Sequence, residues 1–344
     1  MRILFISHHF FPVVGGIEVN SEILAEVFHN AGHLVRLVTW SKDPAGKTFP
    51  YPIIRNPAML TLMAEHSRAD VIFENNPSLR LSWPAVLFKR PTVIALNTWV
   101  ARVDGSLNWQ DKLKFSWLNR AKAVIAVSEA IRIRCCKNAV VIGNPYRQQI
   151  FRKMPEVDRD LWFVFVGRLV SDKGVDLAIR AIHSLVSNDD SLGRRERYRL
   201  TIIGDGPERN SLEQLASSLG LKQLVDFKGV LRGDDLVRSL NRHRFLLVPS
   251  VWEEPFGNVA LEGMACGCVP IVSDGGGLPD AVGDAGITFK RNDLEDLVAQ
   301  IKKVLENQAL QDDLMQKAEL HLQKHHPVQV GEQYLRVIES ALST

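Results

Sequence analysis

Two glutamates lie eight residues apart in the stretch EEPFGNVALEGMACG, residues 253–267. Glu254 precedes a Pro-Phe-Gly turn, and Glu262 lies in the apolar pattern NVALEGMAC, which predicts a helix that ends at Gly267. The first amides of a helix lack partners and attract anions, while a carboxylate can accept hydrogen bonds from two adjacent hydroxyls. The segment can therefore hold a sugar at Glu254, a phosphate at the helix start and a ribose at Glu262. A solvated helix face is the alternative, but it does not explain a carboxylate among apolar residues.

Two cations form the second candidate group. In GRLVSDKG, a strand pattern ends at Gly167, Arg168 and Lys173 follow, and Gly174 precedes the next helical pattern. Cations at the end of a buried strand suit a diphosphate, because arginine offers a planar fork of donors and lysine a point charge. Loop cations are also common as solvated charges, so this turn alone leaves both interpretations open.

Two further glycine turns carry less chemical information. Gly15 and Gly16 in VVGGIEVN come before a helical pattern, where the backbone can approach an anion closely. The turn GDGP (204–207) lacks the GxGxxG spacing, and no acidic ribose ligand follows at the distance expected for NAD. An NAD-dependent oxidoreductase is therefore a weak alternative, and we expect the GDGP turn to be structural.

Short apolar runs that alternate with longer amphipathic patterns must position these residues. The runs are continuous rather than alternating, which is typical of parallel strands buried on both faces, and patterns such as 18–30 and 174–187 indicate helices. The sequence therefore predicts an α/β protein with doubly wound sheets. The predicted strands are 2–7, 33–39, 70–73, 92–96, 123–127, 139–143, 161–167, 199–204, 224–229, 244–250 and 269–273.

The strand series is interrupted at 143–160, a polar stretch with two prolines that we interpret as a linker. It divides the chain into two Rossmann-like domains, residues 1–148 and 149–326, and residues 327–344 form an amphipathic terminal helix. We expect the two domains to face each other across a central cleft, with the strand ends pointing into it, because such sheets bind ligands there.

The composition is that of an ordinary globular chain, with 46% hydrophobic and 24% charged residues among 344. No apolar run approaches the roughly 20 residues of a membrane span, and His8 and His9 interrupt the first run, so we expect no signal peptide. The four cysteines lack the spacing of zinc sites. We therefore expect reduced, buried thiols in a cytosolic protein.

Charge is distributed unevenly. Residues 1–150 hold 18 Lys and Arg against 10 Asp and Glu, a net charge of +8, and the remainder has a net charge of −5. A basic half suggests an anionic partner. Trp99, Trp109 and Trp117 lie among the cations of residues 89–153, where NWQDKLKFSWLNRAK could form a basic amphipathic helix at an anionic membrane. Tryptophans in the core and lysines in water are the alternative.

As a set, these motifs resemble the retaining GT-B glycosyltransferases of family 4, the glycosyl transferases group 1. The resemblance covers nearly the whole chain, and the Glu-x7-Glu pattern beside PFG, with GRLVSDKG before it, is its most specific part. It implies that the helix 327–344 packs back onto the first domain and that the second domain holds most of a nucleotide-sugar donor. The matching segments are GGIE (15–18), AVSE (126–129), IGNPY (142–146), GRLVSDKG (167–174), GDGPE (204–208), FKGVL (227–231), PSVWEEPFGNVALEGMACG (249–267) and GGLPD (276–280).

The resemblance implies roles for individual residues. Arg168 and Lys173 correspond to the diphosphate clamp, Glu254 to the carboxylate beside the donor sugar, and Glu262 to the ribose ligand. Glu18, in the GGIE motif, falls on the acceptor side. The other donor-binding positions are Gly16, Gly167, Val230, Leu231, Phe256, Gly257, Asn258 and Val259.

One position departs from the family pattern. Family members commonly carry a histidine after the strand that reads TVIALNTW here, where this chain has Asn97. An amide cannot take up a proton as imidazole can, so a side-chain base at this position is in doubt. We still expect Asn97 to act at the catalytic site, through its backbone carbonyl or through an amide hydrogen bond to a hydroxyl. Asp280, where the family often has glutamate, is a mild change.

The resemblance implies transfer of a hexose, with UDP-glucose as the expected donor, to a glycan or lipid-linked acceptor in polysaccharide or glycoconjugate biosynthesis. The anomeric configuration would be retained, and the leaving phosphate oxygen could accept the acceptor's proton. No cofactor and no metal is expected, because cations and helix amides supply positive charge and the only D-x-D, residues 158–160, reads as solvated.

The expected partners are the donor and the acceptor, without nucleic acid. The expected location is the cytoplasm, with peripheral contact at the inner face of an anionic membrane. Two alternatives stay open: a non-catalytic homologue that binds sugar nucleotides, and a GT-B-like epimerase of the nucleotide sugar.

Overall fold

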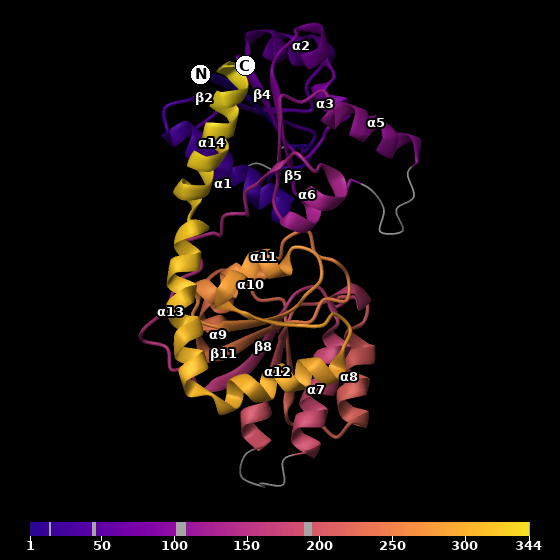
Figure 1. The fold of residues 1–344 in the computed structure, drawn as a ribbon, viewed down its shortest axis with the longest axis vertical. Helices are drawn as coiled ribbons and strands as arrows, with labels where there is room; N and C mark the ends of the chain where they lie inside the picture. The colour runs from indigo at the N-terminus through magenta and orange to yellow at the C-terminus, as the bar shows by residue number, and fades with distance from the viewer. Residues whose placement is uncertain (14, 43–45, 101–107, 189–194, 344) are drawn as a thin grey trace. The chain divides into compact units, whose positions relative to one another are not determined.

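The structure is a computed structural model that describes residues 1–13, 15–42, 46–100, 108–188 and 195–343. These residues form two compact units, each built on one parallel sheet (Figure 1). Unit 1 comprises Met1–Pro145 and His325–Thr344, and unit 2 comprises Tyr146–Lys324.

Unit 1 contains a seven-stranded sheet in the order β3-β2-β1-β4-β5-β6-β7, with all neighbours parallel. The winding direction reverses between β1 and β4, which defines a doubly wound Rossmann-type sheet. The central strands β4 and β5 are buried along their whole length, as continuous apolar runs require. The strands are β1 Arg2–Ile6, β2 Leu34–Thr39, β3 Ile53–Arg55, β4 Val71–Asn75, β5 Thr92–Leu96, β6 Ala123–Ala126 and β7 Val140–Val141.

Helices cover both faces of this sheet. Ile3 and Phe5 of β1 belong to the buried cluster that includes helices α1 and α14, whereas Leu4 and Ile6 belong to the cluster that includes α2. The C-terminal helix α14 therefore completes the core of unit 1. The helices are α1 Gly16–Asn30, α2 Met59–Arg68, α3 Leu79–Ser82, α4 Pro84–Leu87, α5 Trp109–Leu118, α6 Glu129–Cys135 and α14 Pro327–Ser343.

Unit 2 repeats the topology with six parallel strands in the order β10-β9-β8-β11-β12-β13, and the winding reverses between β8 and β11. Phe163 and Phe165 of β8 pack with Ile179 of α7 and Ile301 of α12 in its main core. The strands are β8 Leu161–Val166, β9 Leu200–Ile203, β10 Val225–Gly229, β11 His243–Val248, β12 Val269–Ser273 and β13 Ile287–Phe289. The helices are α7 Val175–Ser187, α8 Arg209–Ser218, α9 Gly233–Arg242, α10 Asn258–Ala265, α11 Leu278–Val282, α12 Leu294–Glu306 and α13 Gln308–Lys324, with short 3-10 turns η1 Ser171–Lys173, η2 Arg195–Tyr198 and η3 Gly283–Ala285.

The predicted fold class, α/β with two Rossmann-like units, is confirmed. Each predicted strand is present, with its ends shifted by at most two residues. The sequence analysis missed β3 and β13, because a strand of three residues carries too little pattern to detect. Within the described residues, no helix has the length and apolar character needed to cross a bilayer.

Glycines pack the loops of unit 2 against one another. At Gly204, which follows β9, φ is +143°, and an added Cβ would lie 1.8 Å from the carbonyl oxygen of Gly167 at the end of β8. Gly206 approaches the Leu169 carbonyl in the same way, with a Cβ distance of 2.3 Å. The GDGP turn is therefore structural, since it lets the loop after β9 lie against the loop after β8.

We expect Gly204→Ala to lower the free energy of unfolding by about 3 kcal/mol. Alanine is strained at this φ, and its Cβ would clash with the Gly167 carbonyl, so the loops after β8 and β9 would have to move apart. Gly32→Ala is the matched control: its φ is +86°, but nothing lies within 4 Å of an added Cβ. In the control, the free energy of unfolding should fall by only about 1 kcal/mol, the cost of placing alanine at a positive φ. Urea denaturation measures both, and equal losses would contradict the packing role of Gly204.

Candidate functional site

The candidate residues of unit 2 lie where the strand order reverses. Strands β8 and β11 are adjacent and parallel, so the loops that follow them start at the same edge of the sheet. The loop after β8 carries Arg168 and Lys173, and the loop after β11 carries Glu254. In doubly wound sheets, ligands bind outside the carboxyl ends of the strands at this reversal. The topology therefore places the candidate residues in the usual ligand position.

Lys173 and Glu254 contact each other directly. The Lys173 ammonium donates to Glu254 Oε1, which also accepts from the Ser250 hydroxyl at 2.7 Å. Gly174 makes this approach possible: its φ is +63°, and an added Cβ would lie 2.0 Å from the Pro249 carbonyl oxygen. The side chains of Lys173 and Glu254 are only 29% and 12% exposed, so their attraction is less screened than that of a surface pair.

Arg168 has a different environment. It directly follows Gly167 at the end of β8, and its side chain is exposed. No described residue forms a hydrogen bond or ion pair with the Arg168 guanidinium. The Arg168 guanidinium can therefore bind an anion without breaking an existing contact. Lys173 is already bonded to Glu254, so it must either bind both groups or give up its bond to Glu254 when it binds an anion.

Helix α10 begins four residues after Glu254, and no side chain caps the amides of its first turn. Gly257 precedes the helix with a φ of +114° and offers no capping group, and an added Cβ would lie 2.4 Å from Leu278. Asn258 and Val259 are the first helical residues, and Phe256 next to them is buried. The first amides of such a helix suit a phosphate oxygen.

Glu262 lies one turn further along α10 and forms an ion pair that the sequence analysis missed. Its Oε1 accepts from Arg147 Nη2 at 3.1 Å, and the Arg147 guanidinium lies 5.0 Å from the centre of the Phe151 ring. Burial raises the pKa of Glu262, and the attraction of Arg147 partly offsets that effect. Arg147 directly follows the IGNPY motif, but its partner is 115 residues away in the chain, so no local pattern links the two.

Two of the predicted donor-binding positions, Val230 and Leu231, lie two strands away from β8. Val230 and Leu231 follow β10, at the same edge of the sheet as Gly167. Val230 is 56% exposed, and Leu231 lines a pocket with Asp235 and other residues of α9. A role of these two residues in donor binding stays a prediction.

Three predicted residues belong to unit 1. Gly16 begins α1 and is exposed, and the carboxylate of Glu18 lies beside Gly15, where an added Cβ would be 2.5 Å from Glu18 Oε2. Asn97 follows β5 and is 7% exposed. Gly16 and Glu18 therefore share the first turn of α1, and Asn97 is linked to the same helix through the hydrogen bonds described next.

Asn97 is the centre of a buried amide network. Its side-chain oxygen accepts from Asn20 of α1 at 2.8 Å, and its amide donates to Asn75 Oδ1 at 2.7 Å. Asn20 also donates to Asn144 of the IGNPY motif at 3.1 Å. The network ties β4, the end of β5 and α1 to the IGNPY segment. Both ends of the Asn97 amide are thus engaged within unit 1.

The D-x-D motif of residues 158–160 does not form a carboxylate pair in the site. Asp160 forms an exposed ion pair with Arg242 at 2.6 Å, which lowers the pKa of Asp160, and Arg159 donates to the Cys266 carbonyl at 2.8 Å. In the part of the chain that the structure describes, no three His, Cys, Asp or Glu side chains gather in the manner of a metal site.

Comparison with known proteins defines the class. Residues 146–321 match the model of the family Glycosyl transferases group 1. The match covers half of the chain and most of unit 2, and the chain belongs to this family. The fold is that of the GT-B glycosyltransferases.

Individual relatives extend the comparison. The chain is 38% identical over 125 residues to an uncharacterized glycosyltransferase of Methanocaldococcus jannaschii. This alignment covers 36% of this chain and 30% of the relative. It is 27% identical over 341 residues to the phosphatidylinositol N-acetylglucosaminyltransferase gpi3 subunit of Schizosaccharomyces pombe, which covers 87% of this chain and 72% of the relative. Among solved structures, Anabaena HepE in complex with UDP superposes with a TM-score of 0.82 at 20% identity, over 99% of this chain and 100% of that chain.

Proposed function

We propose that this chain transfers a hexose from a nucleoside-diphosphate sugar to a hydroxyl of a glycan or lipid-linked acceptor, with retention at the anomeric carbon. The proposed donor is UDP-glucose, the proposed setting is polysaccharide or glycoconjugate biosynthesis, and the transfer needs no metal. One arrangement in unit 2 carries the proposal. Lys173 and Glu254 form a pair in the loops that follow β8 and β11, and the start of α10 and the half-buried Glu262 follow Glu254 along the chain.

The positive groups of this arrangement would act on the leaving diphosphate. Negative charge grows on the diphosphate as the glycosidic bond breaks, so a cation stabilises the transition state more than the bound donor. The Arg168 side chain has no partner among the described residues and can meet this charge, and Lys173 follows in the same loop. The first amides of α10 add a third source of positive potential. These groups supply the charge stabilisation for which other transferases use a metal ion.

The two glutamates would hold the sugars on either side of the diphosphate. Glu254 keeps one carboxylate oxygen bonded to Lys173 and Ser250, which leaves Oε2 for a hydroxyl of the donor hexose. Glu262 would accept hydrogen bonds from the two ribose hydroxyls, and its ion pair with Arg147 favours the ionised carboxylate. This order matches the order of the groups in a nucleotide sugar.

Asn97 would contribute through its backbone rather than its side chain. Both ends of its amide are engaged with Asn20 and Asn75, whereas its backbone carbonyl accepts no hydrogen bond from another described residue. That carbonyl can accept a hydroxyl of the donor sugar. The proton of the acceptor would then pass to the leaving phosphate oxygen on the same face, which is consistent with retention.

The choice of UDP-glucose is supported by likeness of fold. Anabaena HepE has been solved with UDP and also with UDP-glucose, the latter with a TM-score of 0.77 to this chain. A ribose ligand at Glu262 agrees with a ribonucleoside donor. Unit 1 would select the acceptor.

The proposed location is the cytoplasm, at the inner face of an anionic membrane. Helix α5 falls in the segment for which membrane contact was predicted, and residues 101–107 of that segment lie outside the described residues. Trp109 is 68% exposed, whereas Trp117 Nε1 donates to the buried Glu74 at 2.8 Å and Trp99 lies under Arg134 at 4.2 Å. Only one of the three tryptophans is therefore free to enter a membrane.

A thermal-shift series with nucleotides, followed by a transfer assay, tests the proposal. UDP and UDP-glucose should raise the melting temperature, since a ligand at 100 times its Kd adds about 2.7 kcal/mol of stability. Transfer should persist after EDTA treatment, and the product should keep the donor's anomeric configuration. An epimer formed from donor alone would favour the epimerase, and donor binding without transfer or hydrolysis would favour a non-catalytic homologue.

A further inference from the structure

A basic pocket of about 430 Å³ opens at the amino ends of β5 and β6 in unit 1. Four cations line it: Lys89, Arg90, Arg120 and Lys122. No carboxylate of the described chain lines the pocket, and none of the four cations forms an ion pair with a described Asp or Glu. Like charges that share a pocket repel one another unless an anion lies between them. The pocket therefore suits a phosphate-bearing ligand.

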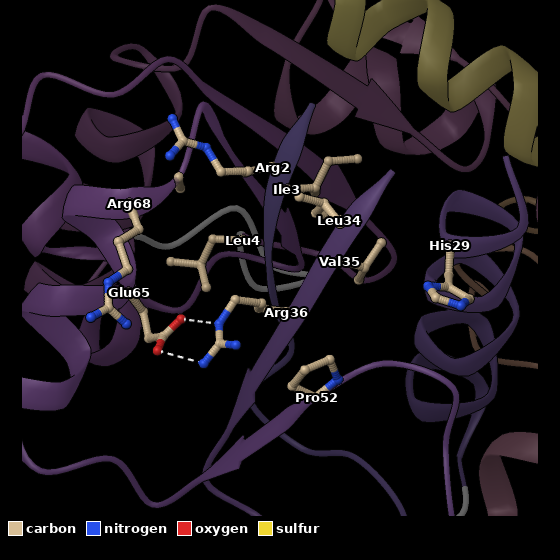
Figure 2. A pocket seen from close by; sticks show the side chains of 11 residues that line it. Arg2, Ile3, Leu4, His29, Leu34, Val35, Arg36, Pro52, Glu65 and Arg68 are labelled. Carbon is tan, nitrogen blue, oxygen red and sulfur yellow. Dashed lines mark hydrogen bonds and ion pairs between the residues drawn. The ribbon is translucent and has the colours of Figure 1, made fainter. Parts of the chain in front are cut away.

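An apolar pocket of about 320 Å³ lies at the amino ends of β1 and β2 in the same unit (Figure 2). Its apolar lining consists of Ile3, Leu4, Leu34, Val35, Pro52 and Ala69. Arg2, Arg36 and Arg68 lie beside these apolar side chains in Figure 2; Arg36 donates a hydrogen bond of 2.8 Å to Glu65, and Arg2 forms an ion pair of 2.6 Å with Asp70. Arg68 is exposed and has no ion pair with a described residue.

The two pockets belong to one continuous edge of the sheet. Because the sheet is parallel, the amino ends of all its strands lie on the same side. Backbone hydrogen bonds link Asp70 to Arg2 and Lys122 to Thr92, each at 2.9 Å. Arg90 of the basic pocket donates to the carbonyl of Ser67, the residue before Arg68 of the apolar pocket. The pockets are therefore neighbours on a single face, which we call the amino-edge face.

Exposed aliphatic side chains accompany the cations on this face. Leu34, which lines the apolar pocket at the start of β2, is 67% exposed. Val86 and Leu342, which line the basic pocket, are each 40% exposed. A soluble phosphate compound would leave these side chains in water. A bilayer surface would cover them while its phosphates meet the cations.

We propose that the amino-edge face docks unit 1 onto a membrane that contains anionic phospholipid, with a lipid phosphate in the basic pocket. The aliphatic side chains would enter the boundary between headgroups and acyl chains. The face lies at the end of the sheet opposite to the strand carboxyl ends, where α1 begins and Asn97 lies, so docking leaves those ends open. The docking face rests on the proposed function for its purpose. A glycosyltransferase docked on the membrane would meet lipid-linked acceptors directly.

Vesicle flotation of the full chain tests this docking. The protein should float with vesicles of phosphatidylcholine that contain one quarter phosphatidylglycerol, and should stay behind with pure phosphatidylcholine. The triple variant Lys89→Gln, Arg120→Gln, Lys122→Gln should bind roughly 100-fold more weakly, since each cation near the surface contributes about a fivefold factor. Arg90 is left in place because it bonds to the Ser67 carbonyl. Leu34→Asn with Val86→Asn should also weaken binding, because both side chains line pockets of this face.

The matched control removes the same charge from unit 2 through Lys222→Gln, Lys302→Gln and Lys303→Gln, all at exposed positions. This control should float like the unmodified protein. Equal loss in both triple variants would show that net charge alone drives binding and would overturn the docking face. Unmodified protein that fails to float with anionic vesicles would overturn it as well.

Two further measurements distinguish a soluble phosphate ligand from a membrane, and a failure of the docking proposal from a failure of the proposed donor. If glycerophosphate releases the protein from vesicles and sodium chloride of equal ionic strength does not, the pocket takes a free phosphate compound and the docking proposal is wrong. The UDP-induced thermal shift should be the same in the unmodified protein and in the Lys89 triple variant. Loss of that shift in the unmodified protein would refute the proposed donor, while the flotation result would still decide the docking face.

Discussion

Alanine in place of Lys173 should lower kcat for sugar transfer by roughly 10²- to 10³-fold, with a much smaller change in the Kd for UDP. The ammonium lies in the loop after β8, bonded to Glu254, where the departing diphosphate would gather charge. A group that meets charge formed during the reaction acts mainly on the transition state. Steady-state kinetics with UDP-glucose, together with calorimetric titration of UDP, would separate the two effects.

The Lys173 variant also loses a structural contact, and Arg168→Ala provides the control. Among the described residues, removal of Lys173 leaves the Glu254 carboxylate with one partner, Ser250, which should lower the free energy of unfolding by about 1–3 kcal/mol. Arg168 is exposed and unpaired among the described residues, so its removal should cost no more than about 0.5 kcal/mol. A large fall in kcat for Arg168→Ala therefore reports on chemistry alone. Unchanged kcat in both variants would refute the diphosphate clamp.

The sequence predicts the fold well because the sheets are parallel and buried. Parallel strands covered on both faces need continuous apolar runs, and runs such as TVIAL and FLLV are easy to recognise. Strands β3 and β13 escape detection because each has three residues and lies in a short apolar run. The edge strand β7 is detected although it has two residues, because it lies within the longer apolar run AVVIG.

Long-range side-chain contacts set the limit of prediction in the site. Glycine turns and the charge pattern place Lys173, Glu254 and Glu262 in loops at one edge of a sheet, but no spacing rule pairs Glu262 with Arg147. The amide network around Asn97 is hidden for the same reason, since its members come from separate strands and a helix. Only the folded chain shows that the Asn97 side chain is already engaged.

Alanine in place of Glu262 should weaken UDP binding by roughly 2–3 kcal/mol, or about 30- to 150-fold, because two hydroxyls lose a charged acceptor. Calorimetric titration measures this loss directly. The loss of binding free energy should come only from the contact with the ribose hydroxyls. The matched control ligand is therefore 2′-deoxyuridine diphosphate, which lacks one of them. The unmodified protein should prefer UDP over the deoxy compound, and Glu262→Ala should bind both with similar affinity.

The pH dependence of binding provides a second test of the same residue. The ionised form of Glu262 is the better acceptor, and burial raises its pKa, so UDP affinity should fall as the pH drops through that raised value. Arg147→Met removes the attraction that favours the ionised carboxylate, which should raise the pKa of Glu262 further and move the loss of affinity to higher pH. A pH profile that Arg147→Met leaves unchanged, or a Glu262→Ala variant that still prefers UDP over its deoxy analogue, would show that the ribose binds elsewhere.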